Sequence, residues 1–98
     1  MSSPTTTAPA MLQKAADLLI ERGKQYDSPE GERSMAQTVE AFNAITCHDL
    51  SEADGWLLMA LLKMVRDNKR SIVHVDSCED LIAYAALYSE ARIERGAA

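Results

Sequence analysis

Apolar residues recur every three to four positions through most of the chain, which is the spacing of amphipathic helices. The pattern predicts four helices, over residues 10–22, 33–45, 51–68 and 76–95. The longest β-branched stretch, residues 71–75, is too short and too isolated to build a sheet. We therefore expect an all-α fold, a four-helix bundle that forms a single domain over residues 10–96.

Short motifs mark where these helices begin and end. Ser51 and Asp54 have the spacing of a capping box at the start of the third helix, and Asp76 and Glu79 repeat that spacing at the start of the fourth. Gly23 is expected to end the first helix and Gly96 the last. Residues 1–9 consist of Met, Ser, Thr, Pro and Ala, which predicts a disordered tail.

The same spacing assigns the sides of the helices that face the core. The expected core residues are Leu12, Ala15, Ala16 and Leu19 in the first helix and Met35, Val39 and Phe42 in the second. The third helix differs from the others, because every residue from Trp56 to Val65 except Lys63 is apolar. A helix that is apolar on all sides is either central in its domain or shared with another subunit. We expect a homodimer or a larger homo-oligomer.

Composition narrows the classes of function. The 98 residues carry a net charge of −5, which disfavours a nucleic-acid binder that must neutralise phosphates. No apolar run approaches the roughly 18 residues of a membrane span, and the N-terminus lacks the pattern of a signal peptide. Cys47 and Cys78 are expected to be free thiols in a reducing cytoplasm. Without a C-x₂-C spacing, they are poor candidates for a zinc site with His48 and His74.

Acidic residues on the third and fourth helices are the candidates for metal binding. Asp76 and Asp80 lie one turn apart, so their carboxylates can share a divalent cation such as Mg²⁺. Two neighbouring carboxylates also repel each other, and we expect Asp80→Asn to leave the fold nearly intact. Asp54 is a third candidate ligand. The alternative is that Asp76 and Asp54 only cap their helices.

Basic residues gather at the end of the third helix. Lys63, Arg66 and Arg70 fall on one stripe of this helix, where they could meet an anionic ligand. The alternative is that these cations only complement the negative end of the helix dipole. Tyr26 and Tyr84 are the aromatic residues that could stack on, or hydrogen-bond to, such a ligand.

Three short motifs occur in order along residues 12 to 92: R-G-K-x-Y at residues 22–26, D…K-x-x-R at residues 54–66, and D-x-x-x-D-x-x-x-Y at residues 76–84. With these motifs the chain resembles a family of small bacteriophage proteins related to the MazG-like, all-α nucleoside triphosphate pyrophosphohydrolases. The resemblance implies helix-borne carboxylates that hold Mg²⁺ for the hydrolysis of a nucleotide, with Asp80 matching the aspartate of the second acidic motif. It departs from the enzymes in lacking the first motif, E-E-x-x-E, and in having Ser77 where they have glutamate.

These observations leave three hypotheses open. The first is a Mg²⁺-dependent hydrolase in which Asp76, Asp80 and Asp54 hold the metal. The second is a non-catalytic module that binds a nucleotide, such as a signalling nucleotide in phage counter-defence. In both, the substrate-binding residues are Tyr26, Lys63, Arg66 and Tyr84. The third hypothesis is a module that binds a host protein.

Overall fold

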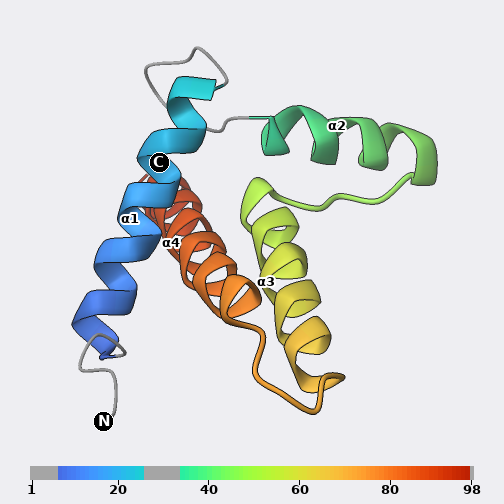
Figure 1. Cartoon of the computed structure of the whole chain (residues 1–98). Helices are drawn as coiled ribbons and strands as arrows, with labels where there is room; N and C mark the ends of the chain where they lie inside the picture. Colours follow the sequence, from blue (N-terminus) through green and yellow to red (C-terminus); the bar gives the residue numbers. More distant parts are fainter. Residues whose placement is uncertain (1–6, 26–33, 98) are drawn as a thin grey trace, which may run out of the picture.

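The structure, a computed structural model, describes residues 7–25 and 34–97. These contain four helices and no strand: α1 (Ala8–Gln25), α2 (Met35–Thr46), α3 (Glu52–Asn68) and α4 (Val75–Ala97). Helix α4 packs against both α3 and α1, and α2 packs against α3. Figure 1 shows the result, with α4 between α1 and α3 and with α2 beside the start of α3, away from α1. The predicted all-α, four-helix architecture is confirmed.

The cap predicted for α3 is present. The Ser51 side chain accepts a hydrogen bond from the Asp54 backbone N–H, and the Asp54 carboxylate accepts one from the Ser51 backbone N–H, at 3.1 and 2.9 Å. This reciprocal pair satisfies donors that the first turn of a helix leaves without partners. Asp54 therefore caps α3, which is one of the two roles that the sequence predicted for it.

Two other helix ends differ from the prediction. Helix α1 continues through Gly23 to Gln25, and Gly23 is buried, so this glycine does not end the helix. Helix α4 begins at Val75, which places Asp76 inside the first turn and not at the cap. The His74 carbonyl accepts the bond from the Cys78 N–H at 3.1 Å, so His74 occupies the capping position.

The predicted N-terminal tail overlaps the first helix. Residues 1–6 lie outside the described residues, but α1 already begins at Ala8. The Thr7 side chain accepts a hydrogen bond from the Ala10 N–H at 3.2 Å, which is the geometry of an N-cap. Thr7 therefore starts the helix inside the segment that composition alone assigned to the tail.

The core is narrow and is centred on α3 and α4. Trp56 is 3% exposed, and its ring stacks on that of Tyr84 with centroids 5.7 Å apart. Small buried residues let the helices approach closely: Ala53 and Ala60 on α3, Ala83 on α4 and Ala15 on α1. The prediction was wrong for Leu12, Ala16 and Phe42, which are exposed because α1 and α2 each pack on a single neighbouring helix.

Gly55 allows α2 to lie directly against α3. A Cβ atom at this position would collide with the Met35 side chain and would come within 2.8 Å of Val39 Cγ2. Val39 is buried and is the main anchor of α2. The absence of a side chain at Gly55 is thus a packing requirement of the α2–α3 contact.

We expect Gly55→Ala to destabilise the protein by about 1–2 kcal/mol, because forcing an extra methyl group into a packed contact shifts its neighbours. Glycine-to-alanine changes inside helices otherwise stabilise by roughly 0.5–1 kcal/mol. Urea denaturation followed by circular dichroism measures the difference. Increased stability of the variant would show that α2 does not pack on α3 at this point.

Candidate functional site

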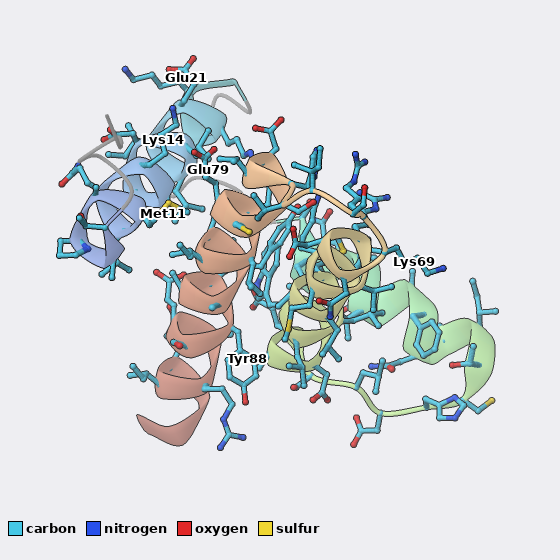
Figure 2. All side chains as sticks on the ribbon, turned by 60° about the horizontal axis from the view of Figure 1, so that its bottom comes forward. Met11, Lys14, Glu21, Lys69, Glu79 and Tyr88 are labelled. Atoms are coloured by element: carbon cyan, nitrogen blue, oxygen red, sulfur yellow. The ribbon has the colours of Figure 1, made fainter. Side chains whose placement is uncertain are left out.

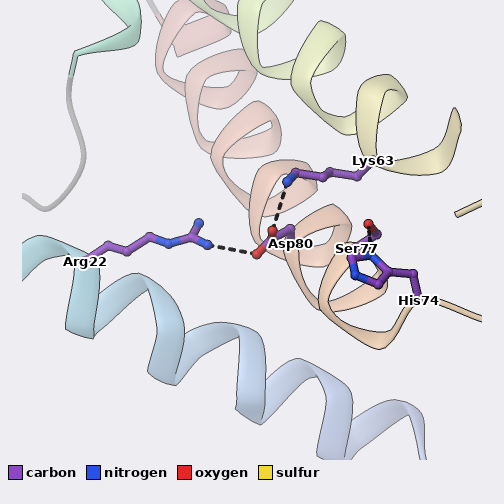
Figure 3. Close-up of polar contacts among 5 residues, drawn as sticks. All are labelled: Arg22, Lys63, His74, Ser77 and Asp80. Carbon is purple, nitrogen blue, oxygen red and sulfur yellow. Dashed lines mark hydrogen bonds and ion pairs between the residues drawn. The ribbon is translucent and has the colours of Figure 1, made fainter. Parts of the chain in front are cut away.

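Asp80 is the centre of a charged cluster that joins three helices. One carboxylate oxygen accepts a hydrogen bond from Arg22 Nη2 of α1 at 2.8 Å, and the other lies 3.1 Å from Lys63 Nζ of α3. Figure 3 shows the two cations approaching the carboxylate from different helices, Arg22 from α1 and Lys63 from α3. The side chains of Lys63 and Asp80 are 14% and 16% exposed, and that of Arg22 is 30% exposed. The Arg22–Asp80–Lys63 cluster is therefore partly shielded but reachable from solvent.

The cluster holds Asp80 in its ionised form. Burial alone would raise the pKa of this carboxyl, but the hydrogen bonds from Lys63 and Arg22, together with their positive charges, outweigh it and lower the pKa below the usual value. The cluster thus brings two cations, from two different helices, to a single carboxylate.

A small cavity adjoins the cluster between the second half of α3 and the start of α4. It has a volume of about 160 Å³, and its lining residues are Lys63, Met64, Asp67, Asn68, Ser77, Cys78 and Leu81. The Ser77 side chain is 1% exposed and shares a hydrogen bond with His74 Nδ1 at 2.5 Å (Figure 3). Asp67 accepts the His74 backbone N–H at 2.8 Å, which ties the loop before α4 to α3.

A second cavity, about 460 Å³ in volume, lies on the other side of α4, against α1. Its lining residues are Ala10, Met11, Lys14, Val73, Val75, Cys78 and Glu79. Figure 2 shows Met11, Lys14 and Glu79 close to one another where the two helices meet. The lining is mainly apolar, with one cation and one anion. Desolvation and the charges of Asp67 and Glu79 raise the pKa of the Cys78 thiol, so this cysteine is a weak nucleophile at neutral pH.

Of the predicted site residues that the structure describes, one pair is joined by an ion pair. Lys63 and Asp80 form an ion pair. Arg66 follows three positions after Lys63 and is exposed, and Asp76 is exposed one turn before Asp80. Asp54 is at the first turn of α3, about 14 Å along the helix from Lys63 at 1.5 Å per residue.

The two tyrosines predicted to contact a ligand have different outcomes. Tyr84 stacks on Trp56 and is half-buried, so its ring is part of the core. Tyr26 lies outside the described residues.

Arg22 was not among the predicted site residues, although it belongs to the R-G-K-x-Y motif. Its position follows Ala15 and Leu19 at helical spacing, and both of these lie on the buried or half-buried side of α1. An arginine at the end of such a stripe indicates a charge that faces another element. The pairing with Asp80 spans 58 residues of sequence, so local spacing does not reveal it.

The described residues contain no group of three or more His, Cys, Asp and Glu side chains that could hold a metal ion. Both oxygens of Asp80 already face cations, which compete with a divalent ion for the same carboxylate. The predicted Mg²⁺ ligand set Asp54, Asp76 and Asp80 is thus dispersed over the start of α3 and two turns of α4.

Comparison with known proteins places the chain in a family without assigning a function. Among the described residues, no helix has the length and apolar character needed to cross a membrane. No curated protein and no solved structure is significantly similar to the chain. A family model described as a domain of unknown function, DUF6378, matches residues 10–92, which include all members of the Arg22–Asp80–Lys63 cluster. The chain therefore belongs to the DUF6378 family.

Proposed function

We propose that this protein binds a nucleotide or another phosphorylated small molecule through the Arg22–Asp80–Lys63 cluster. The observation that supports this proposal is the convergence of two cations, from α1 and α3, on one carboxylate of α4. Asp80 holds both cations in place, one at each carboxylate oxygen. A phosphate oxygen that displaced or joined the carboxylate would find an arginine and a lysine already oriented.

The burial of the cluster strengthens its attraction for an anion. The Lys63 side chain is 14% exposed, so water screens its charge less than that of a fully exposed lysine. The adjoining cavity of about 160 Å³ is smaller than the roughly 300–1,000 Å³ of pockets that enclose a whole drug-sized ligand. It suits one part of a ligand, such as a phosphate group, with the remainder of the molecule outside.

The sequence motifs provide a second line of support. Each of the three motifs that resemble those of MazG-like proteins contributes one residue to the cluster: Arg22 from the first, Lys63 from the second and Asp80 from the third. The motifs are far apart in sequence and meet only in the folded chain. A shared ligand site is one reason for such motifs to converge.

We propose binding of the ligand, and not its hydrolysis, as the main function, because the residues fit an anion better than a metal ion. Asp80 has a cation at each oxygen, and Asp76 is the one other candidate carboxylate one turn away on the same helix. Mg²⁺ is commonly bound by one or two carboxylates together with substrate phosphates. A requirement for Mg²⁺ is thus a separate prediction, to be tested by comparing ligands with and without the ion.

The proposal is tested by thermal-shift and calorimetric titration of nucleoside mono-, di- and triphosphates. A ligand at about 100 times its Kd should stabilise the protein by about 2.7 kcal/mol. Lys63→Ala should weaken binding about tenfold, equivalent to about 1.4 kcal/mol, and the loss should shrink as salt is added. Arg92→Ala is the matched control, since Arg92 is an exposed cation of α4 that lies away from the cluster. Equal binding by the Lys63 variant, or no response to any nucleotide, would contradict the proposal.

A further inference from the structure

Helix α3 has an apolar face that no described part of the chain covers. Trp56 and Ala60 are buried against the rest of the core. At 100° per residue, Leu58, Leu61 and Val65 lie on the opposite side of the helix, and they are 64%, 46% and 50% exposed. Leu57 and Met64 flank them and are 42% and 45% exposed. We call these five residues the α3 outer face.

The chain exposes more surface than a folded monomer of its mass. Its accessible surface is 7190 Å², whereas about 5,500 Å² is expected for a compact 10.8-kDa protein. Its radius of gyration is 15.2 Å, against about 12.6 Å for a compact domain of this length. Part of this exposed surface is the α3 outer face, whose five large apolar side chains are 42–64% exposed.

The charges at the two ends of the α3 outer face are opposite in sign. The carboxylate of Asp54 stands at its N-terminal end, and Arg66 and Lys69 are exposed near its C-terminal end. Figure 2 shows Lys69 at the end of α3, away from the side that packs on α4. A surface that runs from negative through apolar to positive is complementary to itself when a second copy is placed antiparallel.

A two-fold axis that passes between Leu61 and Leu62 would relate two antiparallel α3 helices so that their opposite end charges meet. This axis places each residue opposite the residue of the second copy that lies equally far on the other side of the axis. Leu58 is therefore opposite Val65 of the second copy, and Asp54 is opposite its Lys69. Leu61 lies next to the axis, so it is close to Leu61 and Leu62 of the second copy. The apolar side chains then form the centre of the interface and the charged pairs its rim, which is the usual arrangement of protein interfaces.

We propose that the α3 outer face binds a second copy of this chain, with the two α3 helices antiparallel about this axis. The second copy covers the apolar face, and the end charges set the direction of the helices. This inference is independent of the nucleotide site, since Lys63 lies on the side of α3 that faces α4, where it pairs with Asp80.

Leu61→Glu tests the interface. The wild-type protein should have twice the 10.8-kDa chain mass by light scattering at micromolar concentrations. The variant should be a monomer with unchanged helical circular dichroism, because two glutamates that meet near the axis raise the dissociation constant by roughly 100-fold or more. Ile93→Glu is the control: Ile93 is 72% exposed on α4 and lies outside the face, so this variant should remain a dimer. A monomeric wild-type protein would overturn the proposal and leave the face for a different protein.

Cysteine cross-linking tests the antiparallel direction, including the case in which Leu61→Glu fails to fold. In a chain with Cys47→Ser and Cys78→Ser, oxidation of an equimolar mixture of the Leu58→Cys and Val65→Cys proteins should give a linked heterodimer as the main product. Leu58→Cys alone should cross-link poorly, since the two copies of this residue are separated along the helix. Preferential linkage of Leu58→Cys to itself would overturn the proposed register. Ile93→Cys should remain unlinked.

Discussion

Trp56→Ala is expected to cost about 3–5 kcal/mol of stability, the range found when a large buried aromatic residue is removed. Such a loss is comparable with the total stability of many small domains, about 5–15 kcal/mol. Trp56 is 3% exposed, stacks on Tyr84 of α4, and donates a hydrogen bond from Nε1 to Glu52 at 3.2 Å. Ala53, Ala60 and Ala83, which are buried on the same two helices, have side chains too short to fill the cavity.

Urea denaturation followed by circular dichroism at 222 nm, the standard helix wavelength, measures this effect. Trp56→Phe is the matched control, since it retains an aromatic ring and removes the Nε1–H donor. The phenylalanine variant should lose about 1–2 kcal/mol, through the lost hydrogen bond and the smaller ring. A loss below about 1.5 kcal/mol for the alanine variant would mean that the α3–α4 contact is not the principal core.

Asp80→Asn is expected to cost about 2 kcal/mol. The amide cannot neutralise Arg22 and Lys63 as the carboxylate does, so both partly buried cations would lose the ion pair with residue 80. At roughly 4–8 °C per kcal/mol for a domain of this size, Tm should fall by about 8–16 °C. The sequence alone predicted a nearly intact fold from relief of repulsion with Asp76, but the cations that surround Asp80 reverse the expected sign.

Acid should remove the same stabilisation from the wild-type protein. The pKa of Asp80 is lower in the folded chain than its ordinary value of 3.8, so ionisation favours folding. The contribution is complete above the unfolded pKa, and it is lost as the pH falls below 3.8 through the folded pKa. A plot of unfolding free energy against pH should therefore be flatter below pH 4 for Asp80→Asn than for the wild type.

Asp76→Asn provides the control for both Asp80 experiments. Asp76 is an exposed carboxylate one turn earlier on the same helix, so its replacement should change stability by less than about 0.5 kcal/mol. Equal stability of Asp80→Asn and Asp76→Asn would show that the Arg22–Asp80–Lys63 cluster contributes nothing measurable to the fold.

Much of the helical architecture could be predicted from the sequence, because it depends on contacts between near neighbours. Apolar spacing predicted four helices and no sheet, and the ends of α2 and α3 were predicted to within two residues. The capping box of Ser51 and Asp54 was predictable because both of its hydrogen bonds join residues three positions apart. The apolar run of α3 likewise predicted more apolar surface than one small core can cover, and several apolar side chains of this helix are exposed. The interpretation of Gly23 was wrong because a glycine that ends a helix and a glycine inside a helix look alike in sequence, and Gly23 lies inside α1.

Only the tertiary structure decided which charges meet and which apolar residues are covered. Asp80 looked like a metal ligand beside Asp76, but its carboxylate faces cations from α1 and α3, and Arg22 lies 58 residues away in sequence. Leu12 and Phe42 have the spacing of core residues yet remain exposed, because α1 and α2 each have one helical neighbour. The sequence by itself determined where the helices form and which sides are apolar, through local hydrogen bonds and periodicity. The pairing of those sides depends on contacts between distant segments, which exist only once the chain has folded.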